Sequence, residues 1–178
     1  MDKRTVLLKK LSRRLVRNGA GEMTGRSRAI KIREAIEKTL REEEEPFLLI
    51  LDFGRSGPID FSWADEMVAK LISRLWGGEY GEKFLVLRGL NGSQLENISV
   101  ALERRRLAAL AAGPGGWRIV GSLNNYLVRT LSHIMKKRRL TLRELSAKEG
   151  IGMNTAKSLI LVPRTGIEPV RPLRVPGF

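Results

Sequence analysis

The sequence contains no cysteine and only one histidine, His133, among its 178 residues. The absence of cysteine excludes disulfides, thiolate catalysis and cysteine-ligated zinc, and it fits a reducing cytoplasm. Long apolar runs are lacking as well, because no stretch approaches the roughly 18 uninterrupted apolar residues of a membrane helix. The apolar run near the start is broken by Lys9 and Lys10, so it does not read as a secretory signal. We therefore expect a cytoplasmic protein that has no membrane partner.

Positive charge dominates the composition and is unevenly distributed. The formal net charge is +14. Residues 1–102 hold 18 Lys or Arg against 15 Asp or Glu, whereas residues 103–178 hold 15 against four. Concentrated positive charge is what the neutralisation of phosphates requires, although a solvated basic surface has the same composition. The C-terminal part is therefore the candidate nucleic-acid-binding region.

Strand-like and helical patterns alternate along the first two thirds of the chain. Helical periodicity over 27–45, 62–76 and 93–110 separates strand-like runs at 5–11, 47–53, 84–90 and 117–121, and Ser27 is the expected N-cap of the first helix. This alternation predicts an α/β fold with a small mixed sheet and covering helices. Parallel neighbours should outnumber antiparallel ones except near the N-terminal edge, and Gly113 to Gly116 should form a turn. We expect the core to include Phe47, Leu49, Ile50, Phe84, Val86 and Ile119.

The stretch LILDFGRSGPIDFSWADEMVAKL, residues 49–71, leads from a strand through a glycine-rich turn into a helix. Ser62 stands where an N-cap belongs, and Asp65 and Glu66 favour the positive end of the helix dipole. The pattern around Ser62 is not G-x-S-x-G, and no G-x-x-x-x-G-K-[ST] phosphate loop is present. Asp60 serves better as a turn former than as a metal ligand. The stretch therefore predicts no catalytic residue, no metal site and no cofactor.

The same stretch resembles the strand, loop and helix of STAS domains, the fold of anti-sigma-factor antagonists. Asp52 matches the acid that ends the strand, Ile59 and Asp60 match the I-D of an I-D-S-S-G signature, and Ser62 matches its second serine. Phe61 stands in place of the first serine and Trp63 in place of the glycine. The sequence WADEMVAKL is similar to an uncharacterised bacterial STAS-like family, and the likeness extends over residues 13–121.

This resemblance implies a protein-docking module that a phosphate can switch. Ser62 is the candidate phosphoacceptor, and the alternative is that it only caps the helix. The implied partner is a regulatory protein, either kinase-like or sigma-regulatory. The residues expected to dock it are Asp60, Trp63, Asp65 and Glu66.

The basic segment 122–161 carries the pattern of a helix-turn-helix. A helix expected from about Leu123 is followed by KKRR, by a capping box of Thr141 and Glu144, and by a turn at Gly150 to Gly152. A helical hairpin that only packs on the sheet is the alternative. The segment also resembles the winged helix-turn-helix that follows STAS-like domains. The expected phosphate contacts are Lys136, Lys137, Arg138 and Arg139, and the expected groove contacts are Asn154, Thr155, Lys157 and Ser158.

The last residues, 162–178, hold four of the seven prolines: Pro163, Pro169, Pro172 and Pro176. Such a segment cannot form a helix or a central strand, so we expect a disordered tail in place of the wing, and weaker DNA binding.

Three regions follow: a STAS-like α/β domain at 1–121, a helix-turn-helix-like segment at 122–161 and the tail. The sequence predicts a non-enzymatic bacterial regulator that couples protein interaction to DNA binding in transcription regulation. The alternative is an anti-sigma-factor-antagonist-like module, switched at Ser62, that does not bind DNA.

Overall fold

The computed structural model describes residues 2–15 and 23–137. The chain divides into two compact units, which we call the α/β unit (Met1–Leu123) and the C-terminal unit (Asn124–Phe178). Within the described ranges, no helix combines the length and the hydrophobicity that crossing a bilayer requires.

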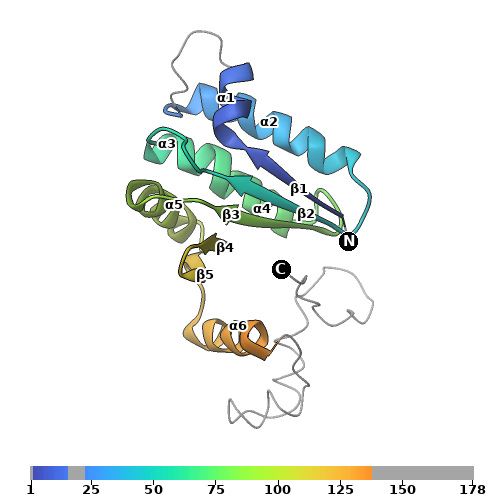
Figure 1. Ribbon diagram of the computed structural model, residues 1–178, viewed down its shortest axis with the longest axis vertical. Coiled ribbons are helices and arrows are strands. Elements are labelled where there is room, and N and C mark those ends of the chain that lie inside the picture. The colour runs from blue at the N-terminus through green and yellow to red at the C-terminus, as the bar shows by residue number, and fades with distance from the viewer. Residues whose placement is uncertain (1, 16–22, 138–178) are drawn as a thin grey trace. The chain divides into compact units, whose positions relative to one another are not determined.

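The α/β unit is built on a five-stranded sheet (Figure 1). The strands lie in sequence order: β1 (Asp2–Leu7), β2 (Phe47–Asp52), β3 (Lys83–Arg88), β4 (Ala108–Gly113) and β5 (Gly116–Gly121). The first three pairings are parallel and β4 pairs with β5 in antiparallel fashion. The parallel majority is confirmed, but the antiparallel pair lies at the opposite edge from the one predicted. The reason is that a tight turn at Gly113 to Gly116 can join only antiparallel neighbours, whereas helices connect the other strands.

Helices connect the parallel strands. They are α1 (Leu8–Leu15), α2 (Arg26–Glu42), the continuous run of α3 (Phe61–Trp63), η1 (Ala64–Ala69, a π-helical segment) and α4 (Lys70–Trp76), and α5 (Gly92–Arg104). Right-handed crossovers between sequential neighbours place all of these helices on one face of the sheet.

Two predicted elements differ from the observed ones. The strand expected at 5–11 is instead the end of β1 followed by α1, and the helix expected to reach residue 110 ends at Arg104. Arg106 then adopts a positive φ of 54°, which turns the chain into β4, a strand that the periodicity did not predict.

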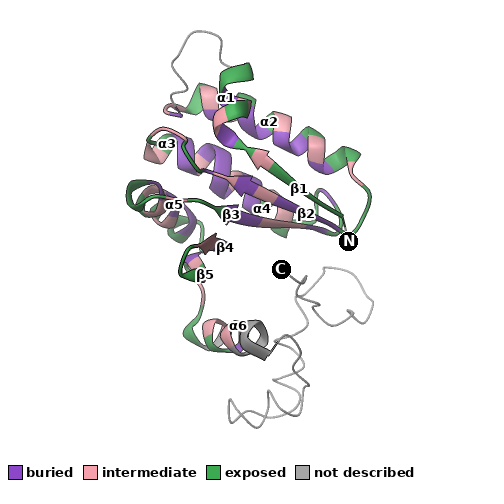
Figure 2. Cartoon of the chain, in the orientation of Figure 1, coloured by how far each residue is buried: buried purple, intermediate pink, exposed green. Residues whose placement is uncertain are grey.

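The core lies between the sheet and its helices. Alternate side chains such as Leu49, Leu51 and Leu87 point into it, and Figure 2 shows the buried stripe that runs under the helices. Leu48 and Val86 are also buried, but they lie outside this cluster because strand side chains alternate between faces. Among the predicted core residues Phe47, Leu49 and Val86 are buried, while the half-buried ones are Ile50, Phe84 and Ile119.

The C-terminal unit is described only through α6 (Asn125–Lys137). This helix confirms the one expected from about Leu123. The capping box, the glycine turn and the second helix of the predicted helix-turn-helix lie outside the described residues, and so does the tail at 162–178.

A candidate docking surface at the start of α3

Asp60 organises the corner between β2 and α3. Its Oδ1 accepts a hydrogen bond from the backbone N–H of Trp63 at 2.7 Å, which makes Asp60 the N-cap of α3. Its Oδ2 accepts from the backbone N–H of Gly25, the N-cap of α2, at 2.8 Å. One carboxylate therefore satisfies donors at the starts of two helices.

The predicted caps Ser62 and Ser27 are both wrong. Ser62 lies inside the first turn of α3 with its side chain exposed, and α2 begins at Arg26, after Gly25. The sequence signal for the true cap of α3 is the aspartate three residues before Trp63, the spacing at which a cap side chain accepts from the N3 amide.

The loop that precedes Asp60 is held from α5. Gln94 is buried, and its Nε2 donates to Ser56 Oγ at 3.0 Å and to the carbonyl oxygen of Gly57 at 2.9 Å. Asn97 Nδ2 donates to the carbonyl oxygen of Ile59 at 3.2 Å. All three bonds come from α5, whose start is capped by Asn91, so they fix the loop in one position relative to that helix.

Asp52, which ends β2, closes the turn below this loop. It accepts from the backbone N–H of Gly54 at 2.7 Å and from Arg88 Nη2 at 2.6 Å. Burial alone would raise the pKa of Asp52, but the bonds from Arg88 and Gly54 outweigh it and lower that pKa. The carboxylate thus stays charged and stabilises the strand end.

Trp63 was expected to dock a partner, and this expectation is wrong. Its side chain is 0% exposed, and its ring packs edge-on against Phe53 with centroids 6.2 Å apart. A large apolar side chain on the inward side of a helix joins the core, so Trp63 fixes the position of α3 instead.

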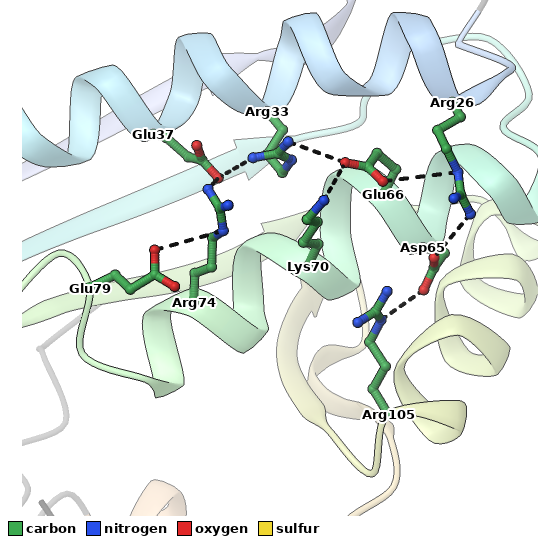
Figure 3. A network of polar contacts seen from close by, with 9 residues as sticks. All are labelled: Arg26, Arg33, Glu37, Asp65, Glu66, Lys70, Arg74, Glu79 and Arg105. Carbon is green, nitrogen blue, oxygen red and sulfur yellow. Dashed lines mark hydrogen bonds and ion pairs between the residues drawn. The ribbon is translucent and has the colours of Figure 1, made fainter. Parts of the chain in front are cut away.

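The two acidic docking candidates on this helix are already paired with cations (Figure 3). Asp65 accepts from Arg105 Nε at 2.7 Å and lies 3.6 Å from Arg26 Nη2. Glu66 is buried, with Arg33 Nη2 at 3.2 Å and Lys70 Nζ at 3.0 Å. With the carboxylate of Asp60 bonded to two backbone amides as well, none of the three acids presents a free negative charge.

Glu66 belongs to an ionic network that joins α2 to η1 and α4. The centre of the network is the buried Arg33, which also contacts Glu37 at 2.5 Å. Arg74 Nη1 donates to Glu37 at 2.8 Å. Burial alone would raise the pKa of Glu37, but its interactions with Arg33 and Arg74 help to lower it overall. Removing one partner of such a buried set leaves an uncompensated charge, so the network holds the two helices in one arrangement.

Three exposed arginines contact residues that lie within one helical turn of Ser62 in the sequence. Arg104 stacks on the ring of Phe61, with its guanidinium carbon 4.6 Å from the centroid. Arg26 and Arg105, which both contact Asp65, keep 60% and 38% of their side chains exposed. We call Phe61, Ser62, Arg26, Arg104 and Arg105 the Ser62 surface. Its exposed charged members are arginines, which suit an acidic segment or a phosphate, whereas three of the four docking residues predicted from the sequence are acids.

The described residues contain no group of three or more side chains that could hold a metal ion. Of the predicted DNA contacts, Lys136 and Lys137 lie in the last turn of α6. The others lie outside the described residues: Arg138, Arg139, Asn154, Thr155, Lys157 and Ser158. Comparison with protein-family models, curated proteins and solved structures gave no match.

Proposed function

We propose that this chain is a non-catalytic regulator of the STAS-like type, in which the α/β unit docks a partner protein and the C-terminal unit binds DNA. The fold supports the first half of the proposal, because its helices cover one face of a mainly parallel sheet and the loop at its β2 to α3 corner is held by hydrogen bonds from α5. The residues exposed at that corner recognise charge and carry no general base.

The charge of the C-terminal unit is the observation that carries DNA binding. Residues 124–178 hold 11 Lys or Arg against three Asp or Glu, a net charge of +8 in 55 residues. Four of these cations are consecutive, Lys136 to Arg139, and the first two of them lie in the last turn of α6. A dense basic run of this kind neutralises backbone phosphates irrespective of base sequence.

The experiment measures the affinity of the chain for a long, labelled duplex of random sequence at several salt concentrations. Fluorescence anisotropy reports the fraction of duplex bound. The full chain should bind with a non-specific dissociation constant of roughly 10⁻⁴ to 10⁻⁶ M at physiological salt. Replacing Lys136, Lys137, Arg138 and Arg139 by Gln should weaken binding and flatten the salt slope by about one unit per lost phosphate contact.

The matched control removes the same charge from scattered, exposed positions of the α/β unit: Lys3→Gln, Lys38→Gln, Arg106→Gln and Arg118→Gln. If the control and the C-terminal variant show the same affinity and the same slope, the C-terminal unit is not the DNA-binding element.

A second candidate function then takes its place, that of an anti-sigma-factor-antagonist-like module without DNA binding. The Ser62 surface favours it, because an exposed hydroxyl flanked by Arg26, Arg104 and Arg105 can hold a phosphate through charge-assisted hydrogen bonds.

A further inference from the structure

The helix α1 is a short cationic helix whose charges all lie on one side. Its sequence, LKKLSRRL, contains four basic residues and no acidic one. Leu8 and Ser12 are buried, while Lys10, Arg13 and Arg14 are exposed and Lys9 is half-buried. Residues three and four apart share a helix face, so these four cations form one basic stripe on the outer side of α1.

Within the part of the chain that the structure describes, the cations of α1 have no carboxylate partners. Among residues 2–15 and 23–137, no ion pair involves Lys9, Lys10, Arg13 or Arg14, nor the exposed Lys31 on the neighbouring helix α2. Elsewhere in the α/β unit most arginines are paired with acids, as Arg33, Arg74, Arg88 and Arg105 are. Residues 3–33 hold 11 Lys or Arg against the single acid Glu22. The first 102 residues are nearly balanced in charge as a whole, but this first segment is strongly basic.

Unpaired like charges are unfavourable on an isolated helix. Lys9 and Arg13, like Lys10 and Arg14, are spaced i, i+4, and like charges at this spacing destabilise a helix. A polyanion lying along the stripe removes this repulsion and releases its own counterions, so binding gains from both sides.

The packing of α1 helps to choose between two polyanionic ligands, an anionic membrane and a nucleic acid. A helix that lies on a membrane needs an exposed apolar face to insert between headgroups. In α1 that face is already used, because Leu8 is fully buried and Leu11 and Leu15 pack against the core. Only charge is left for a ligand, and a nucleic-acid backbone offers charge without requiring insertion. A helix of this length, roughly 12 Å, matches about three phosphates along one strand.

From these observations we propose that α1 forms a second nucleic-acid-binding surface, one that contacts the phosphate backbone without reading sequence. The surface belongs to the α/β unit and does not depend on the DNA binding proposed for the C-terminal unit.

The test therefore uses the full chain in which Lys136, Lys137, Arg138 and Arg139 are already Gln, so that the two surfaces are measured separately. Into this background we introduce Lys9→Gln, Lys10→Gln, Arg13→Gln and Arg14→Gln. The matched control adds the scattered set Lys3→Gln, Lys38→Gln, Arg106→Gln and Arg118→Gln. Duplex binding is measured by anisotropy at low salt, and urea unfolding reports whether each variant is folded.

We expect the α1 variant to lose at least about tenfold more affinity than the control and to flatten the salt slope by about 2–4 units. Equal losses in the two variants would overturn the proposal. If the fourfold α1 variant unfolds, Lys10→Gln with Arg14→Gln, both at exposed positions, should give about half of the slope change. No change in that double variant would overturn it as well.

The membrane alternative is measured in the same series. Vesicles of phosphatidylcholine with and without phosphatidylserine are titrated at the same salt concentration. We expect the duplex to be bound more tightly than either vesicle. Tighter binding to the phosphatidylserine vesicles that is lost in the α1 variant would replace the nucleic-acid assignment by a membrane one.

Discussion

At the scale of single residues, the corner between β2 and α3 depends on an acid that looks interchangeable with its neighbours in the sequence. Asp60, Asp65 and Glu66 all stand near a helix start, and any of them could have faced a partner. Asp60 is instead bonded to the amides of Trp63 and Gly25, and the other two are ion-paired. The corner is thus a structural feature first, and the groups left for recognition are the arginines around Ser62.

This assignment predicts different effects for two neighbouring alanine substitutions. Asp60→Ala should lower the free energy of unfolding by about 1–3 kcal/mol, because α3 loses its cap and the amide of Gly25 loses its acceptor. Ser62→Ala should change it by no more than about 0.5 kcal/mol, as expected for an exposed side chain without a cap role. Urea unfolding of both variants measures the difference.

A larger loss for Ser62→Ala than for Asp60→Ala would show that the serine is the cap after all. Asp60→Asn serves as the conservative control, because it keeps one carbonyl acceptor and should fall between wild type and Asp60→Ala.

The site could be predicted from the sequence only as far as local contacts extend. The strand-end position of Asp52 and the helix-start position of Asp60 follow from residues close in sequence. The same holds for Lys70, which pairs with Glu66 four residues earlier, but not for Arg105 and Arg33, which are 40 and 33 positions from Asp65 and Glu66. Which cation reaches which acid depends on how α2 and α5 pack beside η1, and no local pattern encodes that packing.

At the scale of elements, the same limit explains the missed strand β4. Its sequence AALAAG is rich in alanine, the best helix former, so local propensity extended the preceding helix through it. Pairing with β3 on one side and β5 on the other overrides that propensity. The strands β2 and β3 were found because their apolar runs are buried on both faces or nearly so.

The end of β5 provides a test of this hairpin. Gly121 has a φ of +92°, and a Cβ there would lie 2.4 Å from the carbonyl oxygen of Leu107 and 2.6 Å from Leu102 Cβ. Gly116, in the turn, has a φ of +97° but nothing within 4 Å of such a Cβ. Gly116→Ala should therefore cost about 1 kcal/mol through backbone strain alone, and Gly121→Ala about 1–3 kcal/mol more through the clash.

Thermal or urea unfolding of the two variants isolates the steric term, because the backbone strain is nearly the same in both. Equal destabilisation would mean that the end of α5 yields easily, and that Leu102 and Leu107 do not fix the position of β5.

At the scale of the whole molecule, charge is the property that its two units share. The α/β unit carries a row of four cations on α1, and the C-terminal unit carries a net charge of +8. Two surfaces carried by one chain act at a raised effective concentration if both bind one duplex.

The proposed surfaces should therefore cooperate on long DNA. For two sites that each bind alone with a dissociation constant of roughly 10⁻⁴ M, an effective concentration of about 1 mM gives joint binding a gain of about tenfold, which keeps the full chain within its expected range. Removing either basic set should cost this whole factor on a duplex of about four helical turns. On a duplex of about one turn, which admits only one surface at a time, each removal should cost about twofold, because the other surface still binds.

Anisotropy with the wild-type chain, each fourfold Gln variant and the eightfold variant on both duplexes measures this coupling. The scattered set should show the same small loss at both lengths, since it changes only the overall charge. If each single variant loses the same factor on long and short duplexes, the two surfaces bind independently. Their cations would then serve separate nucleic-acid molecules, because sites that cannot engage one ligand together gain nothing from being linked.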